Sequence, residues 1–329
     1  MSVVFGQIIV GPPGSGKTTY CAAIQDYFNK CTTGNSSRHI YIVNLDAANA
    51  DMPYECAIDL VDLITVDDVC DNLNLGPNGS LMYCIEYIEN NIDWLFKRLE
   101  SLLNKHSSSL PPPYILFDCP GQIELYTHHG SIHRIIEQLL KKMNFRLCCV
   151  NLIDSYYCSN SSNFISALLT SLSMMLHLEL PHVNILSKID LIERYGSLEY
   201  NIDFYTDVLD LSYLMRNKNF NKDKFQPKLA KKYKKLNQSL CDIIQDYSLV
   251  SYIPLHVQDR LSIEKVNNTI DKANGFIFGH LKDDDLSQRT NLMSNAFGVE
   301  QFEYAKTAKI RENYTFVDDD DDDDDAEDN

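Results

Sequence analysis

The sequence predicts a doubly wound α/β fold, in which helices cover both faces of a mostly parallel β-sheet. Short and almost continuously apolar runs recur along the chain, and segments of helix length separate them. Runs of this kind are typical of parallel strands that are buried on both faces. With 329 residues, of which 44% are hydrophobic, the chain is also long enough to bury a sizeable core.

Six such runs predict strands, and a glycine-rich turn follows the first of them. The predicted strands are residues 5–10, 39–45, 114–117, 146–153, 182–186 and 250–255. A helical pattern over residues 17–28 follows the glycine-rich turn. The alternation is interrupted at about 47–113 and 193–246, where we expect helical insertions. We therefore expect a single domain over residues 1–280 that carries both insertions.

The first insertion contains apolar residues at steps of four and three positions, which places them on one face of a helix. These residues are Leu81, Ile85, Ile88, Ile92, Leu95 and Leu99. Packing into the core of the same subunit is one interpretation of this stripe. The segment 104–113 (NKHSSSLPPP) predicts an exposed loop, and the second insertion contains a basic stretch at 216–235, with nine Lys or Arg and one Asp.

The charge distribution argues against direct binding of nucleic acids or anionic membranes. The formal net charge is −17, from 29 Lys and Arg against 46 Asp and Glu, and such a surface repels phosphates. Much of the excess lies in the run from Asp318 to Asp328, so the folded body is only mildly acidic. We expect a helical extension over residues 281–317 and a disordered acidic tail over 318–329.

The chain is predicted to be cytoplasmic, with shuttling to the nucleus as a further expectation. No segment approaches the roughly 18 consecutive apolar residues that a membrane-spanning helix needs, and a nucleotide motif stands where a signal peptide would. The ten cysteines lie in apolar contexts without a Cys-x-x-Cys pair or a histidine at metal-ligand spacing. Reduced, buried thiols are therefore expected.

The glycine-rich turn matches the phosphate-loop pattern G-x-x-x-x-G-K-[ST]. Residues 11–18 read GPPGSGKT and lie between a predicted strand and a predicted helix, which is the context that the motif requires. Backbone N–H groups and the positive helix end would bind phosphate, Lys17 would meet the β and γ phosphates, and Thr18 would bind Mg²⁺. A purely structural turn is the alternative. The expected phosphate-binding residues are Gly14, Ser15, Gly16, Lys17, Thr18 and Thr19.

A second motif is expected on the metal side of the phosphates. The third predicted strand ends in Asp118, and the sequence CPGQ follows it. Asp118 is placed to hold Mg²⁺ through its water shell, and Gly121 to donate its N–H to the γ-phosphate when the adjoining loop swings in. That movement would make the loop a switch. A strand-end or helix-capping role is the alternative for Asp118.

Residues for the attacking water follow from their positions. Asp46 closes the second predicted strand at the carboxyl edge of the sheet, where open α/β sheets bind ligands. Gln122 and Glu124 lie just after Gly121, where an amide and a carboxylate would align and polarise the water. The alternative for Asp46 is a cap for the following turn.

Base selection is predicted for residues 187–190, which read SKID and follow the fifth predicted strand. They resemble the guanine motif Asn-Lys-x-Asp, with Ser in the first position. Asp190 would accept hydrogen bonds from guanine N1 and N2, which adenine cannot donate, and the Lys188 stem would cover the base. Helix capping is the alternative for Asp190. The expected guanine-binding residues are Ser187, Lys188, Ile189 and Asp190.

Together with the tripeptide Gly-Pro-Asn at 76–78, these motifs resemble those of the GPN-loop GTPases. The resemblance covers about residues 5–274, is strongest to the second eukaryotic paralogue, and includes the strings LGPNGSLMYCIEY, DCPGQIEL and LPHVNILSKIDLIE. It implies a hydrolase that binds GTP or GDP with Mg²⁺ and acts as a homodimer or as a heterodimer with a paralogous GPN-loop GTPase. It also implies a role in assembly and nuclear import of RNA polymerases, with RNA polymerase II subunits or assembly factors as partners.

The resemblance also implies roles for site residues. The loop of Gly76, Pro77 and Asn78 would enter the partner's site, with the Asn78 amide near the γ-phosphate, while the face from 81 to 99 packs the dimer. The residues alone favour a turn at 77–79 ahead of a helix that begins near Ser80. The family's water-handling residues correspond to Asp46, Gln122 and Glu124, with Ala47 where the family usually has proline.

Two other function classes remain compatible with a phosphate loop. A small-molecule kinase would use the same loop, but it needs lid arginines, for which Arg194 and Arg216 are the candidates. A scaffold protein would hold the nucleotide without turning it over.

Overall fold

The computed structural model describes the chain between residues 3 and 276, with some internal gaps. The gaps are 31–37, 50, 106–112, 197, 199, 209–210, 212–213 and 215–226. The predicted extension at 281–317 and the acidic tail at 318–329 lie outside the described residues. The same holds for most of the predicted loop at 104–113 and for the first half of the basic stretch.

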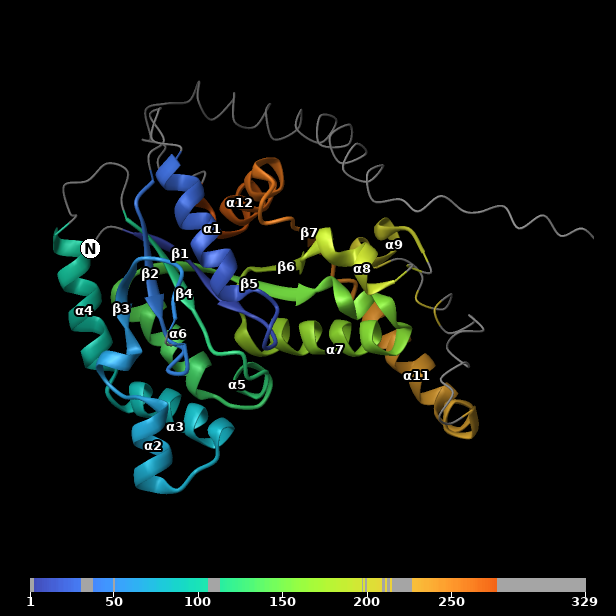
Figure 1. The fold of residues 1–329 in the computed structure, drawn as a ribbon, viewed down its shortest axis with the longest axis horizontal. Helices are drawn as coiled ribbons and strands as arrows, with labels where there is room; N and C mark the ends of the chain where they lie inside the picture. Colours follow the sequence, from blue (N-terminus) through green and yellow to red (C-terminus); the bar gives the residue numbers. More distant parts are fainter. Residues whose placement is uncertain are drawn as a thin grey trace, which may run out of the picture.

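A seven-stranded sheet forms the centre of the molecule, with the strand order β3-β2-β4-β1-β5-β6-β7 (Figure 1). All its pairings are parallel, which confirms the predicted doubly wound α/β fold. The strands are β1 Val4–Val10, β2 Ile40–Asn44, β3 Cys56–Asp59, β4 Tyr114–Asp118, β5 Phe145–Asp154, β6 His182–Ser187 and β7 Tyr252–Pro254.

Strand β3 corrects the prediction that the first insertion is helical throughout. It pairs in parallel with β2 at the edge of the sheet, after a register shift between Ile42 and Val43. Its apolar run is only three residues long, from Cys56 to Ile58, which is too short to predict a strand, and Ile58 is its only buried residue. Pairing with the β2 backbone, and not the side-chain pattern, places these residues in the sheet.

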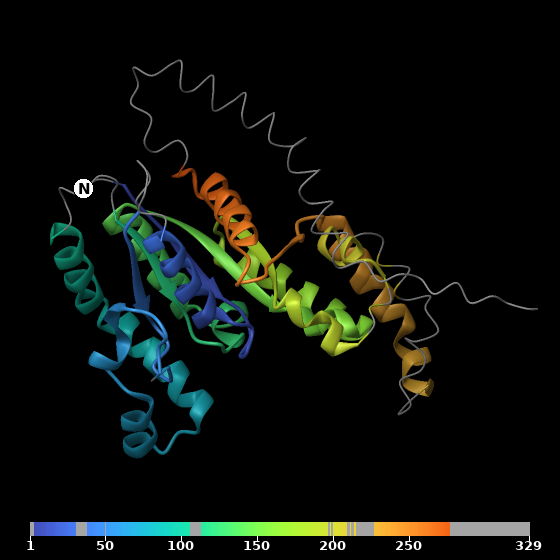
Figure 2. The same cartoon turned by 45° about the horizontal axis from the view of Figure 1, so that its top comes forward.

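Helices cover both faces of the sheet, as the alternation of side chains along β1 shows. Phe5 and Ile9 pack with residues of α1 and α12, whereas Val4 and Ile8 pack with residues of α3, α4, α6 and α7 on the other face (Figures 1 and 2). The longer helices are α1 Lys17–Lys30, α2 Val66–Leu73, α3 Pro77–Asn90, α4 Ile92–Lys105, α6 Ser131–Met143, α7 Ser161–Leu178, α11 Pro227–Tyr247 and α12 Arg260–Asn274. Shorter helices are α5 Glu124–Thr127, α8 Ile192–Tyr195 and α9 Ile202–Thr206.

Helix α3 begins earlier than predicted. Gly76 is its N-cap residue and Pro77 its first residue, so the expected turn at 77–79 is already the first helical turn. Proline suits this position because its fixed φ is helical and the first helical N–H needs no partner within the helix. The carbonyl oxygen of Gly76 accepts the N–H of Ser80 at 2.9 Å, which closes that turn.

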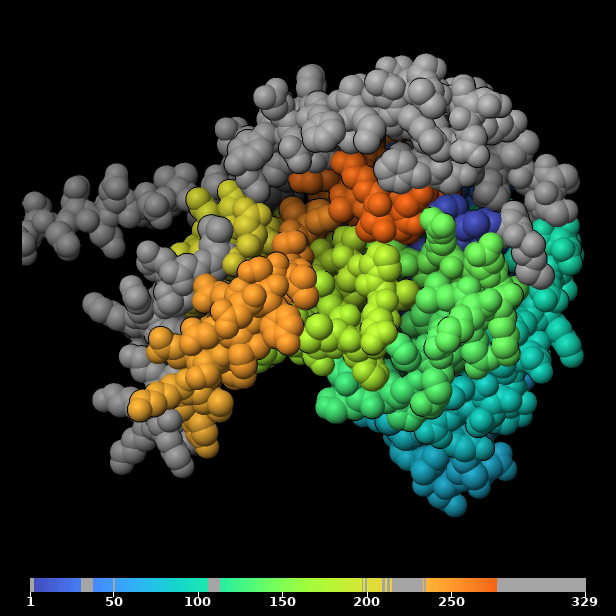
Figure 3. Space-filling model, turned by 180° about the vertical axis from the view of Figure 1, so that it is seen from behind, coloured from blue at the N-terminus to red at the C-terminus, as the bar shows by residue number. Residues whose placement is uncertain are grey.

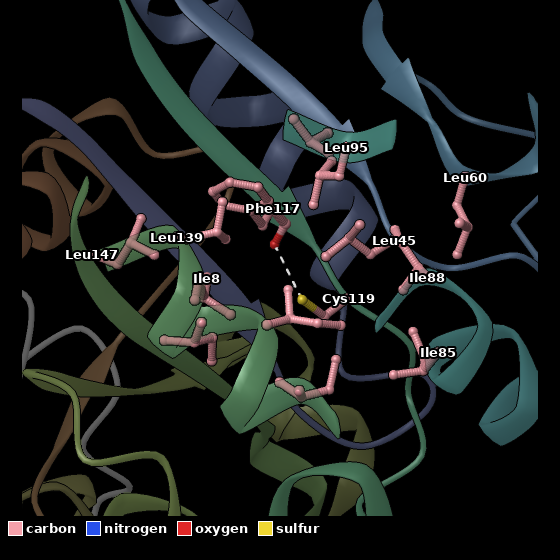
Figure 4. Close-up of a cluster of buried hydrophobic side chains, with 14 of the residues drawn as sticks. Ile8, Leu45, Leu60, Ile85, Ile88, Leu95, Phe117, Cys119, Leu139 and Leu147 are labelled. Carbon is pink, nitrogen blue, oxygen red and sulfur yellow. Dashed lines mark hydrogen bonds between the residues drawn. The ribbon is translucent and has the colours of Figure 1, made fainter. Parts of the chain in front are cut away.

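The apolar stripe of the first insertion is divided between α3 and α4, and all of it is buried inside this chain. Leu95 and Leu99 are 0% exposed and belong to the same hydrophobic cluster as Ile88, Leu45 and Phe117 (Figure 4). This confirms the interpretation as core packing within one subunit. The implied packing of a dimer through this face is wrong, because its side chains are already covered by their own chain.

The second insertion contains α8, α9 and α11. Helix α11 leans on α7 through buried Cys241 and Ile244 and extends away from the sheet (Figures 2 and 3). Among the described helices, none combines the length and apolarity needed to span a bilayer. The described cysteines are free thiols and most of them are buried, in line with the expectation from their apolar contexts.

Truncation of Leu95 to alanine should lower the free energy of unfolding by about 2–5 kcal/mol, because it leaves a cavity in the core. Leu261→Ala on α12 is the control, since Leu261 is 54% exposed, and it should change that energy by less than about 0.5 kcal/mol. Urea unfolding at several protein concentrations measures both. Equal stability of the two variants would mean that the stripe does not form part of the core.

Candidate nucleotide site

The phosphate loop is built around glycines that no other residue can replace without strain. Gly11, Gly14 and Gly16 have φ angles of 142°, 76° and 92°, which L side chains rarely adopt. A Cβ atom at Gly11 would lie 2.3 Å from the carbonyl oxygen of Leu152 on β5. The loop therefore closes directly on the neighbouring strand, between β1 and α1, as the motif predicts.

Lys17 is held over this loop. Its side chain is 8% exposed, and Nζ donates hydrogen bonds to the carbonyl oxygens of Gly11 at 3.1 Å and Pro12 at 3.3 Å. Burial lowers the pKa of Lys17, while the carboxylates of Asp118 and Asp46 act in the opposite direction. The ammonium group is thus placed where the motif binds phosphate. The hydroxyl of Ser15 is buried and has no hydrogen-bond partner in the described part of the chain.

Asp118 ends β4 beside the start of α1 and is 1% exposed. The Tyr54 hydroxyl donates to its Oδ2 at 3.0 Å, and the Thr18 side chain is hydrogen-bonded to the same carboxylate. Burial raises the pKa of Asp118 to about 6, although these hydrogen bonds and the Lys17 charge act to lower it. The two predicted metal ligands, Thr18 and Asp118, therefore lie in contact.

The donor set of Thr18 and Asp118 fits Mg²⁺ that is bound together with a nucleotide. Mg²⁺ prefers oxygen ligands and usually takes only one or two from the protein, the others coming from phosphates and water. The described residues contain no group of three or more His, Cys, Asp or Glu that would hold a metal by themselves. A hydroxyl and a carboxylate beside the phosphate loop are thus the ligands that a nucleotide-bound Mg²⁺ needs.

The predicted switch glycine packs directly on the phosphate loop. A Cβ atom at Gly121 would lie 3.1 Å from Cα of Pro13 and 3.2 Å from Nζ of Lys17, so the approach depends on the missing side chain. The hydroxyl of buried Tyr126 donates to the carbonyl oxygen of Pro120, and this hydrogen bond fixes the loop that carries Gly121. The structure thus already brings Gly121 and Lys17 together, whereas we expected this approach only when the loop swings in, and the movement itself stays a prediction.

The residues predicted to handle water occupy different environments. Oε1 of Gln122 is buried without a hydrogen-bond partner among the described residues, whereas Glu124 is exposed at the start of α5. Asp46 accepts the N–H of Ala48 on Oδ1 at 3.1 Å, so the capping alternative is observed. Burial raises the pKa of Asp46, and the nearby Lys17 charge opposes this shift. Asp46 is thus close enough to Lys17 to interact with its charge, and Gln122 directly follows Gly121, which packs on the phosphate loop.

Ser187 connects the guanine motif to the phosphate loop. Its side chain is 2% exposed, and its hydroxyl oxygen lies 2.7 Å from the carbonyl oxygen of Ser15 and 3.0 Å from that of Ile153. The hydroxyl therefore ties the loop to the end of β5. The structure gives Ser187 a positioning role inside the site, in addition to the predicted place in the guanine motif.

The remaining residues of this motif form a tight turn after β6. Lys188 has a φ of 57°, and its Nζ donates to Oδ2 of Asp154 at 2.7 Å, while the Ser155 hydroxyl donates to its carbonyl oxygen at 2.8 Å. Ile189 is buried and Asp190 is exposed. The motif thus presents the Lys188 stem and the Asp190 carboxylate at the carboxyl edge of the sheet.

The Gly-Pro-Asn segment lies on the surface. Gly76, Pro77 and Asn78 are exposed, and a Cβ atom at Gly76 would meet no atom within 4 Å. Leu73 and Leu75, which precede the segment, are 46% and 39% exposed. Within its own chain, Asn78 is therefore an accessible residue at the start of α3.

The sequence analysis missed three side chains that contact the predicted site residues but lie far from them in the sequence. Tyr54 contacts Asp118, Asp154 binds Lys188, and Nδ2 of Asn49 donates to Oγ1 of Thr18 at 3.3 Å. Asp154 carried a weak signal, because an acid at the carboxyl end of a predicted strand points to the ligand edge of the sheet. Tyr54 and Asn49 carried none, because they lie in a segment that was expected to be helical.

Comparison with known proteins identifies the family. A family model described as "Conserved hypothetical ATP binding protein" matches residues 9–276. A protein of Danio rerio named GPN-loop GTPase 2 is 51% identical over 95% of this chain and 93% of its own length. The chain belongs to the GPN-loop GTPase family. The GPN-loop GTPase 2 of Saccharomyces cerevisiae is 42% identical over 84% of this chain and 76% of its own length.

Membership of this family makes the chain a P-loop GTPase and confirms the resemblance seen in its motifs. The small-molecule kinase alternative is thereby wrong. Of its candidate lid residues, Arg194 is exposed on α8, and Arg216 lies outside the described residues. A GTPase from Pyrococcus abyssi, solved in its apo form, has the same fold with a TM-score of 0.56 at 21% identity, covering 82% of this chain and 97% of its own.

Removal of the Ser187 hydroxyl should weaken the attachment of the phosphate loop to the ends of β5 and β6 in this GPN-loop GTPase. Ser187→Ala removes the single hydroxyl hydrogen that is shared between two buried carbonyl oxygens, which we expect to lower the free energy of unfolding by about 1–3 kcal/mol and to raise the GTP dissociation constant severalfold. Ser166→Ala is the control, because Ser166 is exposed on α7 and its hydroxyl donates to the carbonyl oxygen of Ser162 in the same helix. Urea unfolding and nucleotide titration measure both effects, and identical behaviour of the two variants would contradict the connection.

Proposed function

We propose that this GPN-loop GTPase is a nucleotide switch that binds GTP with Mg²⁺ and hydrolyses it as a dimer. The observation that carries the proposal is the contact of Gly121 with Pro13 and Lys17. A γ-phosphate seated over Lys17 would lie against the Gly121 N–H, so the loop after β4 would respond to its presence or loss.

The phosphate side of the site is divided among few residues. Backbone N–H groups of the loop and the Lys17 ammonium would hold the phosphates, and Thr18 and Asp118 would hold the metal. Mg²⁺ bound there would neutralise charge on the phosphate oxygens. The buried, unpartnered hydroxyl of Ser15 supports this division, because a buried polar atom without a partner is costly unless a ligand completes it.

The attacking water would be oriented by Asp46 and Gln122, with Glu124 reaching it when the loop closes. In support, Oε1 of Gln122 is buried without a partner in the described chain, so it is an acceptor that a water can satisfy. Asn78 would act in the site of the partner subunit and donate its amide to oxygens of the transition state. Its exposure at the start of α3 is compatible with that role.

A role in assembly and nuclear import of RNA polymerase II is the client function that we propose. The partners would be polymerase subunits or assembly factors, together with a second copy of the chain or a paralogous GPN-loop GTPase. Family resemblance supports this part of the proposal, and the acidic charge of the chain argues against direct binding to nucleic acid. The protein would act in the cytoplasm and shuttle to the nucleus.

The Asp190 carboxylate should make the site selective for guanine. Titration with GDP, GTP and ATP analogues in Mg²⁺ should show binding of the guanine nucleotides alone. Asp190→Asn should weaken GTP binding about 100-fold, because it removes a charged acceptor from the base. Asp242→Asn, at an exposed position of α11, is the control and should bind GTP like the wild type. The description of the matching family model names ATP binding. A preference for adenine nucleotides over guanine nucleotides would overturn the proposal.

Asn78→Ala should reduce single-turnover GTP hydrolysis about 100-fold and leave GTP affinity within about twofold, because its amide acts in the transition state. Asn90→Ala is the matched control and should hydrolyse GTP like the wild type, since Asn90 is an exposed asparagine at the other end of the same helix. A sizing column run with GTP shows whether both variants dimerise. Wild-type hydrolysis by a dimeric Asn78→Ala variant would rule out the trans role. GTP bound without turnover by the wild type would instead favour a scaffold.

A further inference from the structure

The connection between β2 and β3 passes beside the metal side of the site. Two of its side chains contact the residues that would hold Mg²⁺, although neither belongs to a nucleotide motif. Tyr54 reaches Asp118 at the end of β4, and Asn49 reaches Thr18 at the start of α1. Asn49 lies near the start of the connection and Tyr54 near its end, and each contacts one of the two neighbouring residues that would hold the metal.

The Tyr54 contact is buried. Tyr54 is 9% exposed and Asp118 is 1% exposed, and the phenol donates to Oδ2 of the carboxylate at 3.0 Å. A hydrogen bond to an ionised group is about twice as strong as one between neutral groups, and burial strengthens it further. This bond fixes one oxygen of the carboxylate and with it the rotation of the Asp118 side chain.

The Asn49 contact supplies a second hydrogen-bond partner for the Thr18 hydroxyl. A hydroxyl has one hydrogen and two lone pairs. The Thr18 side chain is hydrogen-bonded to Asp118 and accepts from Nδ2 of Asn49 at 3.3 Å, which leaves a lone pair for a cation. Asp118 likewise accepts from Tyr54 and Thr18 and retains further acceptor positions for water ligands of a metal.

The connection is held near both of its ends, so the side chains of Asn49 and Tyr54 arrive at fixed positions. At its start, the carbonyl oxygen of Asp46 accepts the N–H of Asn49 at 3.1 Å. At its end, Gln25 of α1 exchanges two hydrogen bonds with the backbone of Glu55, at 2.9 and 3.1 Å. Glu55 directly follows Tyr54, so helix α1, which carries Thr18, also positions the tyrosine.

We propose that Tyr54 is a positioning residue for Mg²⁺, acting through Asp118, and that Asn49 supports it through Thr18. The inference rests on the proposed role of Thr18 and Asp118 as the metal-side residues. Residues that orient metal ligands without touching the metal are worth about 10–100-fold in metal affinity when they are removed. Tyr54 thereby tunes how strongly the metal retains a nucleotide in the site, and it has no part in base recognition.

Release of a fluorescent GDP analogue from the full-length protein, followed over a range of Mg²⁺ concentrations and in EDTA, tests the proposal. Tyr54→Phe removes only the hydroxyl, so it should raise the Mg²⁺ concentration for half-maximal retention about 10-fold. Release in EDTA should stay within about twofold of the wild type. Tyr252→Phe is the matched control, because Tyr252 is 4% exposed and its hydroxyl pairs with Ser171 instead.

Asn49→Ala provides an independent variant and should shift the Mg²⁺ dependence in the same direction by a smaller factor, because its bond is longer and less buried. The proposal is overturned if Tyr54→Phe shows the wild-type Mg²⁺ dependence, or if its release is accelerated equally in EDTA, as a loss of general stability would cause. If release from the wild type does not depend on Mg²⁺ at all, the proposed metal role of Thr18 and Asp118 fails, which is a different result.

Discussion

The close approach of the phosphate loop to the end of β5 is the contact on which the nucleotide site depends. Gly11 faces the carbonyl oxygen of Leu152 with no room for a side chain, and the Ser187 hydroxyl at the end of β6 lies within hydrogen-bond distance of the Ser15 and Ile153 carbonyl oxygens. The loop is therefore fixed by two neighbouring strands and not only by its own glycines. Parallel strands make this possible, because their carboxyl ends meet at one edge.

Burial of charge is the second constraint on this site. Lys17 and Asp118 are each less than 10% exposed. Burial lowers the pKa of Lys17 and raises the pKa of Asp118, because it disfavours the charged form of both groups. Each is stabilised by partners that are fixed in place: loop carbonyl oxygens for the lysine, and the Tyr54 hydroxyl for the aspartate. A site prepared in this way needs little rearrangement when charged phosphates arrive, because the donors and acceptors already stand in position.

The first insertion combines a buried helix face with an exposed segment. The inner face of α3 and α4 belongs to the main hydrophobic cluster, so the insertion is part of the domain core (Figure 4). The Gly-Pro-Asn segment stands at the outer end of α3, in solvent. Because α3 is anchored by its apolar face and begins at Pro77, the exposed segment is held at a defined place. The proposed role of Asn78 in the site of a second subunit needs this combination of a fixed position and an accessible surface.

The sequence by itself determined the features that short segments encode. Glycines at fixed spacing specify the phosphate loop, and apolar runs specify the strands, because both depend on backbone geometry and on burial of neighbouring residues. The tertiary structure decided the contacts between distant segments. Strand β3 exists through its pairing with β2, and the Tyr54 to Asp118 bond joins residues 64 positions apart. Such contacts follow from strand order and from helix placement, neither of which a local pattern specifies.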